Sequence, residues 1–225
     1  MKLSHLLPLV LLLTVAVNAS AQRSSFSNTP VVDATGKPVT VNTYMHIKGS
    51  PFIFDEWLPG EVVTADGELH AGMLLKYNTE TNLLTFVYNP KEEALKFAEP
   101  VTAFTIFGKQ RMNFGKNFPK IDGYGKDSYY EVIALGKATL LKHYRGFLKD
   151  TRSADLSMTD GTYVQRAAYY IFKDGKIARI KPNAKIIQEA FADKSAEVNS
   201  FLVGKGINFE NEEDLKKVFD HYNSL

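Results

Sequence analysis

The sequence predicts a mainly β protein of the α+β class, an antiparallel sandwich or partly open barrel of about nine strands with a short C-terminal helical segment. Short runs in which apolar residues alternate at period two recur between turn residues. The gaps between these runs are too short for crossover helices, which favours antiparallel pairing. After Pro182 the apolar spacing changes to that of a helix. Periodicity alone does not choose between a sandwich and a barrel.

The stretch 61–77 shows the strand pattern best. Two extended runs flank Asp66-Gly67, a dipeptide that tolerates the positive φ angles of a type I′ hairpin turn. A similar dipeptide, Asp174-Gly175, is predicted to join the last two strands. After the first hairpin, alternation predicts strands at 83–88, 95–97, 101–107, 128–135, 138–145, 163–172 and 177–181.

One stretch interrupts the alternation. Glycines and Pro119 within 109–127 predict a long surface loop. Two histidines of the predicted strands, His70 and His143, are expected at solvent-facing positions.

Three short helices are predicted after Pro182. Asn183, Asp193 and Asn211 are the expected N-caps, because each precedes an apolar pattern of helical spacing. Helices this short are not stable alone, so they are expected to pack on each other or on the sheet. The third helix has one apolar stripe, formed by Leu215, Val218, Phe219 and Tyr222.

The first residues resemble a secretory signal peptide. Lys2 precedes an apolar run over 6–17, and Ala19-Ser20-Ala21 is a small-x-small cleavage site. A retained membrane anchor is the alternative, but a bilayer-spanning helix needs about 20 apolar residues, and this run is shorter. We therefore predict export to the periplasm or outside the cell, with no transmembrane span in the mature chain.

The chain then divides into four expected segments: a signal peptide at 1–21, a flexible lead-in at 22–43, an antiparallel β domain at 44–181, and a helical segment at 182–225 packed on the sheet. Cysteine is absent, so stability must come from packing and no lipid can be attached to a cysteine.

Composition and motifs argue against several classes of function. Lys and Arg number 27 against 25 Asp and Glu, and they are interspersed, so no basic stripe predicts nucleic-acid binding. The histidines form no zinc motif, and no Gly-x-Ser-x-Gly elbow is present. We therefore predict a protein that is not an enzyme, with no catalytic, cofactor or metal-binding residue assigned.

Five residues are candidates for contact with a ligand or partner. Asp55, Glu56 and Trp57 form the least ordinary local composition, although Trp57 could simply close one end of the core. In each of two Tyr-Tyr pairs one ring is expected to point inward and one outward, which makes Tyr129 and Tyr170 candidates. Cross-strand packing explains these tyrosines equally well.

Several short motifs resemble a family of uncharacterised exported proteins from Bacteroidota-type Gram-negative bacteria. The motifs are Lys48-Gly49-Ser50-Pro51-Phe52, Phe54-Asp55-Glu56-Trp57, Ala65-Asp66-Gly67-Glu68, the segment 169–176 and the ending Tyr222-Asn223-Ser224-Leu225. The resemblance implies a cell-envelope location and brings no activity or catalytic residue.

We therefore expect an exported non-catalytic binding or envelope-scaffold protein, whose partner is an unknown envelope protein or a small apolar ligand. The alternative is a periplasmic carrier that holds an apolar or aromatic ligand between the curved sheet and the helices.

Overall fold

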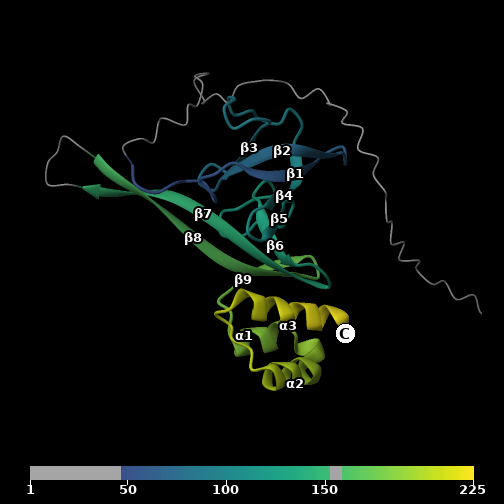
Figure 1. Ribbon diagram of the computed structural model, residues 1–225. Helices are drawn as coiled ribbons and strands as arrows, with labels where there is room; N and C mark the ends of the chain where they lie inside the picture. Colours follow the sequence, from purple (N-terminus) through teal and green to yellow (C-terminus); the bar gives the residue numbers. More distant parts are fainter. Residues whose placement is uncertain (1–46, 153–158) are drawn as a thin grey trace, which may run out of the picture.

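A computed structural model describes residues 47–152 and 159–225. The predicted signal peptide, the lead-in and the first residues of the β domain lie outside the described part. The described chain forms a nine-stranded antiparallel sheet that does not close, with the order β3-β2-β1-β4-β5-β6-β7-β8-β9 (Figure 1). The predicted mainly β fold with a C-terminal helical segment is confirmed. The strands are β1 Leu58–Thr64, β2 Leu69–Asn78, β3 Leu83–Val87, β4 Val101–Phe107, β5 Arg111–Gly115, β6 Tyr130–Ala134, β7 Ala138–Arg152, β8 Thr159–Lys173 and β9 Lys176–Ile180.

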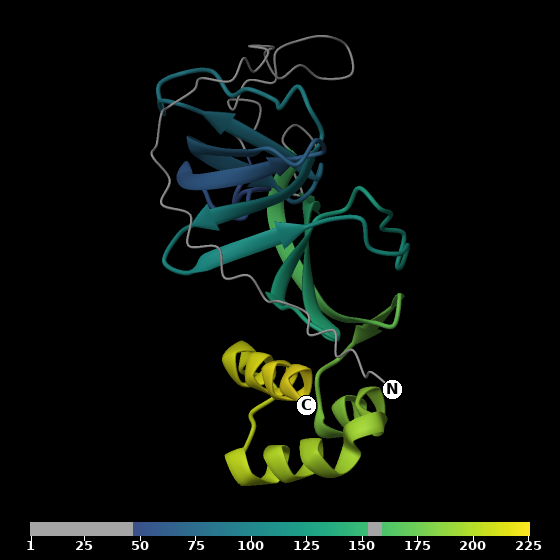
Figure 2. The ribbon, with the colours of Figure 1, turned by 90° about the vertical axis from the view of Figure 1, so that its right-hand side faces the viewer.

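Three α-helices follow the sheet and lie together beneath one end of it (Figures 1 and 2). They are α1 Ala184–Ala190, α2 Ser195–Lys205 and α3 Glu212–Ser224, with a 3₁₀ turn, η2, at Ala192–Lys194. The side chain of Asn183 accepts a hydrogen bond from a backbone N–H of α1, and Asn211 does the same for α3, so both predicted caps are confirmed. No helix among the described residues is long and apolar enough to cross a membrane.

Asp193 does not cap a helix, which corrects the prediction for α2. It lies in η2, and α2 begins after it without a side-chain cap. The carboxylate of Asp193 instead accepts hydrogen bonds from Lys173 of β8 and Tyr222 of α3, at 2.6 and 2.8 Å. A tertiary contact between sheet and helix has therefore taken the place of the local cap.

The two Asp-Gly hairpins differ. At the β8–β9 turn, Asp174 and Gly175 have φ angles of +52° and +72°, as a type I′ turn requires. At the β1–β2 turn only Gly67 has a positive φ, +87°, so the expected type I′ turn does not form there. The hydroxyl of Thr64 donates to the carboxylate of Asp66 at 2.6 Å, and the N–H of Gly67 donates to the Thr64 carbonyl at 3.0 Å. This pattern belongs to a longer loop with a glycine bulge.

Two strand predictions need correction. The segment 109–127, predicted as a loop, contains β5, which pairs with both β4 and β6. Its buried residue, Phe114, stacks on Phe104 of β4 with ring centroids 4.5 Å apart, a contact that depends on tertiary pairing. Conversely, the predicted strand at 95–97 is reduced to a single bridge between Leu95 and Phe86.

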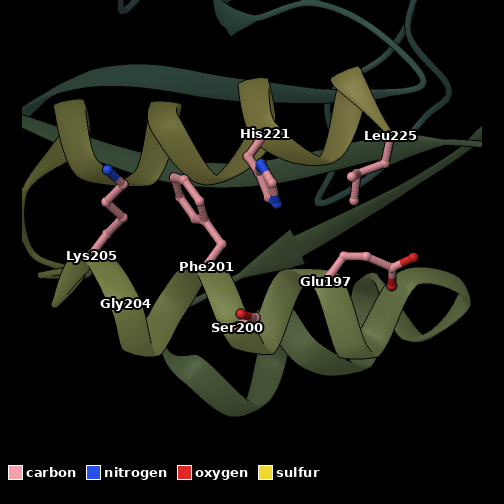
Figure 3. A pocket seen from close by; sticks show the side chains of 7 residues that line it. All are labelled: Glu197, Ser200, Phe201, Gly204, Lys205, His221 and Leu225. Carbon is pink, nitrogen blue, oxygen red and sulfur yellow. The ribbon is translucent and has the colours of Figure 1, made fainter.

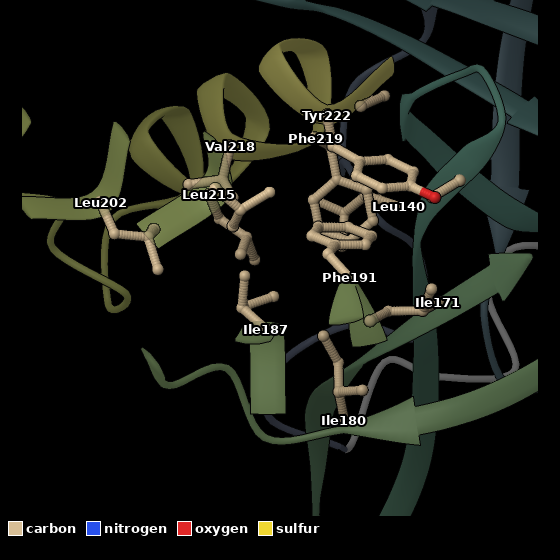
Figure 4. Packing of buried hydrophobic residues seen from close by; sticks show 13 residues of the cluster. Leu140, Ile171, Ile180, Ile187, Phe191, Leu202, Leu215, Val218, Phe219 and Tyr222 are labelled. Carbon is tan, nitrogen blue, oxygen red and sulfur yellow. The ribbon is translucent and has the colours of Figure 1, made fainter. Parts of the chain in front are cut away.

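The main apolar cores lie at opposite ends of the sheet. One fills the curve of β1 to β5 and is rich in aromatic rings, including Tyr77, Phe104 and Phe114. The other joins the helices to β6–β9 and contains thirteen buried residues (Figure 4). The four residues of the predicted stripe on α3 all belong to this second core, so the prediction that the helical segment packs on the sheet is confirmed. That core consists of Ala134, Ala138, Leu140, Ile171, Ile180, Ile187, Phe191, Val198, Leu202, Leu215, Val218, Phe219 and Tyr222.

Candidate functional site

The face of β7–β9 that points away from the helices carries the candidate site. Because side chains alternate along a strand, Leu140 faces the helices while its neighbour Leu141 faces the other side. Leu141 and Tyr170 are covered there by the segment 116–128 between β5 and β6, which we call the cover loop. The cover loop packs Phe118 and Tyr124 against them.

A pocket of about 370 Å³ lies between the cover loop and this face of the sheet. Three arginines from three neighbouring strands meet around it: Arg145 of β7, Arg166 of β8 and Arg179 of β9. Arg145 and Arg166 are directly opposite each other in the β7–β8 ladder. The complete lining is Asp122, Tyr124, His143, Arg145, Arg166, Ala167, Ala168, Tyr170 and Arg179.

Positive charge is in excess at this pocket. Asp122 is the only carboxylate among the lining residues; it accepts a hydrogen bond from the Tyr170 hydroxyl at 3.0 Å and forms an ion pair with Arg179 at 3.5 Å. Among the described residues, neither Arg145 nor Arg166 forms an ion pair with a carboxylate. Three guanidinium groups against one carboxylate leave two positive charges, and like charges directly opposite on a sheet repel each other.

His143 forms the buried wall of the pocket. It is only 6% exposed, and its ring lies 3.8 Å from that of Tyr124 in the cover loop. Burial, together with the nearby charge of Arg145, lowers the pKa of His143 to about 4, so the ring is neutral at pH 7. The predicted solvent-facing position of His143 is wrong because the cover loop buries a sheet face that the strand pattern alone leaves open.

A buried hydroxyl lies next to this wall. The ring of Tyr130 is 5.0 Å from that of His143, and its hydroxyl has no hydrogen-bond partner in the described part of the chain. Burial raises the pKa of Tyr130 to about 12, so the hydroxyl keeps its proton. The hydroxyl therefore remains a hydrogen-bond donor.

These groups are suited to hold an anion. Guanidinium groups bind carboxylate and phosphate oxygens through two parallel hydrogen bonds. The described residues contain no cluster of three or more His, Cys, Asp or Glu that could hold a metal ion. The geometry thus provides donors and positive charge in a pocket with an aromatic wall.

The five predicted contact residues lie in different places. Asp55 and Glu56 are exposed before β1, and the ammonium group of Lys76 donates to the Asp55 carbonyl at 2.5 Å. Trp57 is half-buried beside the same lysine, whose nitrogen lies 5.6 Å from its ring centroid. None of the three lines the arginine pocket.

The two tyrosines also differ. Tyr170 lines the pocket, although its ring is buried under the cover loop. Tyr129 lies in the aromatic core of β1 to β5 and donates to the carbonyl of Val101 at 2.8 Å. Both Tyr129 and Tyr130 are buried, so the expectation of one outward ring is wrong for this pair. Both faces of the sheet are covered at this point, and each ring enters a different core.

The sequence pattern does not point to the three arginines. Each lies in an ordinary alternating strand, where a single polar residue is expected to face solvent. The signal that could have found them is the register of the β7–β8 hairpin, because only this register places Arg145 opposite Arg166. The residues that connect β7 to β8, 153–158, lie outside the described residues, and their sequence has no Asn-Gly or Asp-Gly that would fix the register.

A second hollow lies between α2 and α3, where it is lined by both helices and by the C-terminal Leu225 (Figure 3). The rings of Phe201 and His221 stack there at 4.2 Å. Its charged residues, Glu197 and Lys205, have opposite signs, so this hollow concentrates no net charge. We therefore consider the arginine pocket the stronger candidate.

Comparison of the chain with protein-family models, with curated proteins and with solved structures gave no match. The resemblance to exported proteins of Bacteroidota-type bacteria therefore stays a prediction.

Proposed function

We propose that this protein is an exported, non-catalytic binding protein that takes an anionic group in the arginine pocket. The observation that carries the proposal is the pair Arg145 and Arg166, directly opposite each other without a carboxylate partner among the described residues. Such a pair costs stability in the free protein, and an anion between the two guanidinium groups would offset that cost.

The protonation behaviour of the pocket favours binding over catalysis. A general base works best when its pKa lies near the operating pH, but the pKa of His143 is about 4. Burial also raises the pKa values of Tyr130 and Tyr170, the direction opposite to that needed to activate them as bases or nucleophiles. These shifts fit a site that keeps its groups in fixed protonation states.

The alternative of an apolar carrier has less support. Such a carrier would hold its ligand between the sheet and the helices, where Leu140, Phe191 and Phe219 are fully buried against other apolar side chains (Figure 4). The rings of Phe191 and Tyr222 stack at 4.0 Å in this space. Close-packed side chains therefore occupy the position that a ligand would need.

Calorimetric titration with citrate, a tricarboxylate, tests the proposed anion site. Arg145→Gln and Arg166→Gln should each weaken citrate binding by roughly tenfold or more, since a hydrogen bond to a charged group contributes about 1.5–3 kcal/mol. Arg111→Gln is the matched control: Arg111 is exposed and pairs with Glu61 on β1, outside the pocket. Equal losses in all three variants would mean that only overall charge matters.

Export is tested separately. Mass spectrometry of protein recovered from the native envelope should find Gln22 as the N-terminal residue. Protein from that fraction with an intact Met1 would overturn the export part of the proposal.

A further inference from the structure

The edge of β8 beside the arginine pocket is open over several residues. β7 pairs with β8 along its whole length, but β9 covers only Tyr169–Lys173 on the other side. Further along, Lys48 forms a single bridge to Thr162. Between these two points, residues 164–168 have a strand neighbour on one side only, as far as the described chain goes.

The backbone pattern shows which groups point to this open edge. The N–H of Tyr163 and the carbonyl of Gly161 point outward, because both bond to Lys48. Successive residues of a strand direct their backbone groups to opposite sides, so Gln165 and Ala167 also point outward. Their N–H and carbonyl groups form no backbone hydrogen bond with any described residue. They are a template for an added strand.

Two hollows meet at this edge. A hollow of about 450 Å³ lies where β9 ends, bordered by Lys181 and Pro182. It shares Ala167, Ala168 and Arg179 with the arginine pocket. A chain lying along the edge would therefore have room beside the small alanines and would pass next to the guanidinium groups.

We infer that the partner is an acidic, extended segment of another polypeptide, which adds as a strand to β8 at 164–168 and directs its carboxylates toward Arg145, Arg166 and Arg179. This inference rests on the proposed function and names the ligand of the same site. Main-chain hydrogen bonds to Gln165 and Ala167 would supply affinity, and the arginines would select acidic side chains.

Charge argues against two other occupants. A second copy of this chain that paired at the same edge would bring the Arg166 side chains of both copies together, and like charges across strands repel. The segment 22–46 of the chain itself contains one acid, Asp33, against Arg23 and Lys37, so its net charge is positive and does not complement the arginines. An acidic segment from a different protein satisfies both the edge and the arginines.

Fluorescence anisotropy with a short, blocked peptide in which Glu alternates with Val tests the inference. N-methylation of the alternate residues that would bond to β8 removes backbone donors without changing the charge of the peptide. We expect the methylated peptide to bind about tenfold more weakly, as the loss of two ordinary hydrogen bonds predicts. Both peptides should bind more weakly at high salt, because the arginines contribute through charge.

A protein variant tests the same edge from the other side. Gln165→Pro removes one outward N–H, and proline is tolerated at an edge where that group faces solvent. Gln165 does not line the arginine pocket, so this variant should weaken binding of the unmethylated peptide several-fold and leave citrate binding unchanged. Gln165→Ala is the matched control, because both variants lose the side-chain hydrogen bond to the Phe52 carbonyl and only the proline variant loses the N–H. The melting temperature of each variant verifies folding, and the methylated peptide tests the edge even if Gln165→Pro fails to fold.

The outcomes separate the two proposals. If citrate binding depends on Arg145 and Arg166 but methylation of the peptide has no effect, strand addition is wrong and the anion site stands. If neither citrate nor the peptide binds, both proposals are wrong.

Discussion

The two faces of β7–β9 belong to the same strands but differ in whether their basic residues have carboxylate partners. On the face that meets the helices, Lys142 forms an ion pair with Glu212 of α3 at 2.6 Å, and Lys173 pairs with Asp193 at the same distance. On the opposite face, Arg145 and Arg166 stand against each other without a carboxylate among the described residues. Lys142 and Lys173 therefore have carboxylate partners within the fold, whereas Arg145 and Arg166, on the other face of the same two strands, have none among the described residues.

This difference distinguishes cations that stabilise the fold from cations that are available to bind an anion. A buried or half-buried cation that already has its carboxylate has nothing to offer a ligand, and its removal exposes an unpaired partner. Clustered cations without carboxylate partners repel each other in the free protein, and a bound anion would relieve this repulsion. The helix face therefore stabilises the fold, and the arginine face provides the proposed function.

The largest expected effect comes from the helix face. Phe219→Ala removes a fully buried ring that packs edge-to-face on Phe191, and should lower the free energy of unfolding by about 3–5 kcal/mol. Citrate binding at temperatures where the variant is folded should not change. Val203→Ala is the control, since Val203 is 86% exposed on α2.

Chemical denaturation midpoints of both variants measure this effect. A loss below about 1 kcal/mol for Phe219→Ala would contradict a permanent core. It would indicate instead that the helices cover the sheet only part of the time.

A smaller effect is expected from His143 on the arginine face. Its pKa is about 4 when folded and near 6.5 when unfolded, so the unfolded state binds more protons between these values. The stability that neutral His143 contributes is complete above pH 6.5 and decreases as the pH falls toward 4, by on the order of 3 kcal/mol.

His143→Phe keeps an aromatic ring against Tyr124 and removes the proton. The difference in unfolding free energy between wild type and variant should therefore change over this pH window, measured by denaturation at each pH. A difference independent of pH would show that the cover loop does not bury His143 in solution.

Local patterns in the sequence predict most of the fold. The type I′ turn at Asp174-Gly175 and the caps at Asn183 and Asn211 follow from the conformations that these residues favour, so they could be predicted. Asp193 has the same cap chemistry, but Lys173 and Tyr222 bind its carboxylate. A contact from another element outweighed the local preference there.

The site could not be predicted in the same way. Arg145, Arg166 and Arg179 come together only through the registers of two strand pairs. The burial of His143 depends on the cover loop, whose glycines indicate a loop but not the sheet face on which it lies. Tyr170 is the one candidate contact of the sequence that lines the pocket. Its strand position alone does not distinguish a binding surface from a core. Predicting the site would require the register of the strand pairs and the sheet face that the cover loop covers, and neither follows from local sequence patterns.

The smallest expected effect is a change in unfolding free energy that should have opposite signs on the two faces of β7–β9. Arg145→Gln removes one of two like charges directly opposite on β7 and β8, so it should raise the free energy of unfolding by about 0.2–1 kcal/mol. The same variant is expected to weaken citrate binding, so stability and binding should change in opposite directions. Lys142→Gln on the helix face is the counterpart: it removes the partner of Glu212 and should lower stability. Denaturation of both variants in one buffer decides the comparison. If Arg145→Gln destabilises the protein as Lys142→Gln does, Arg145 is a structural charge with a partner in the fold, and the arginine pair no longer indicates a binding site.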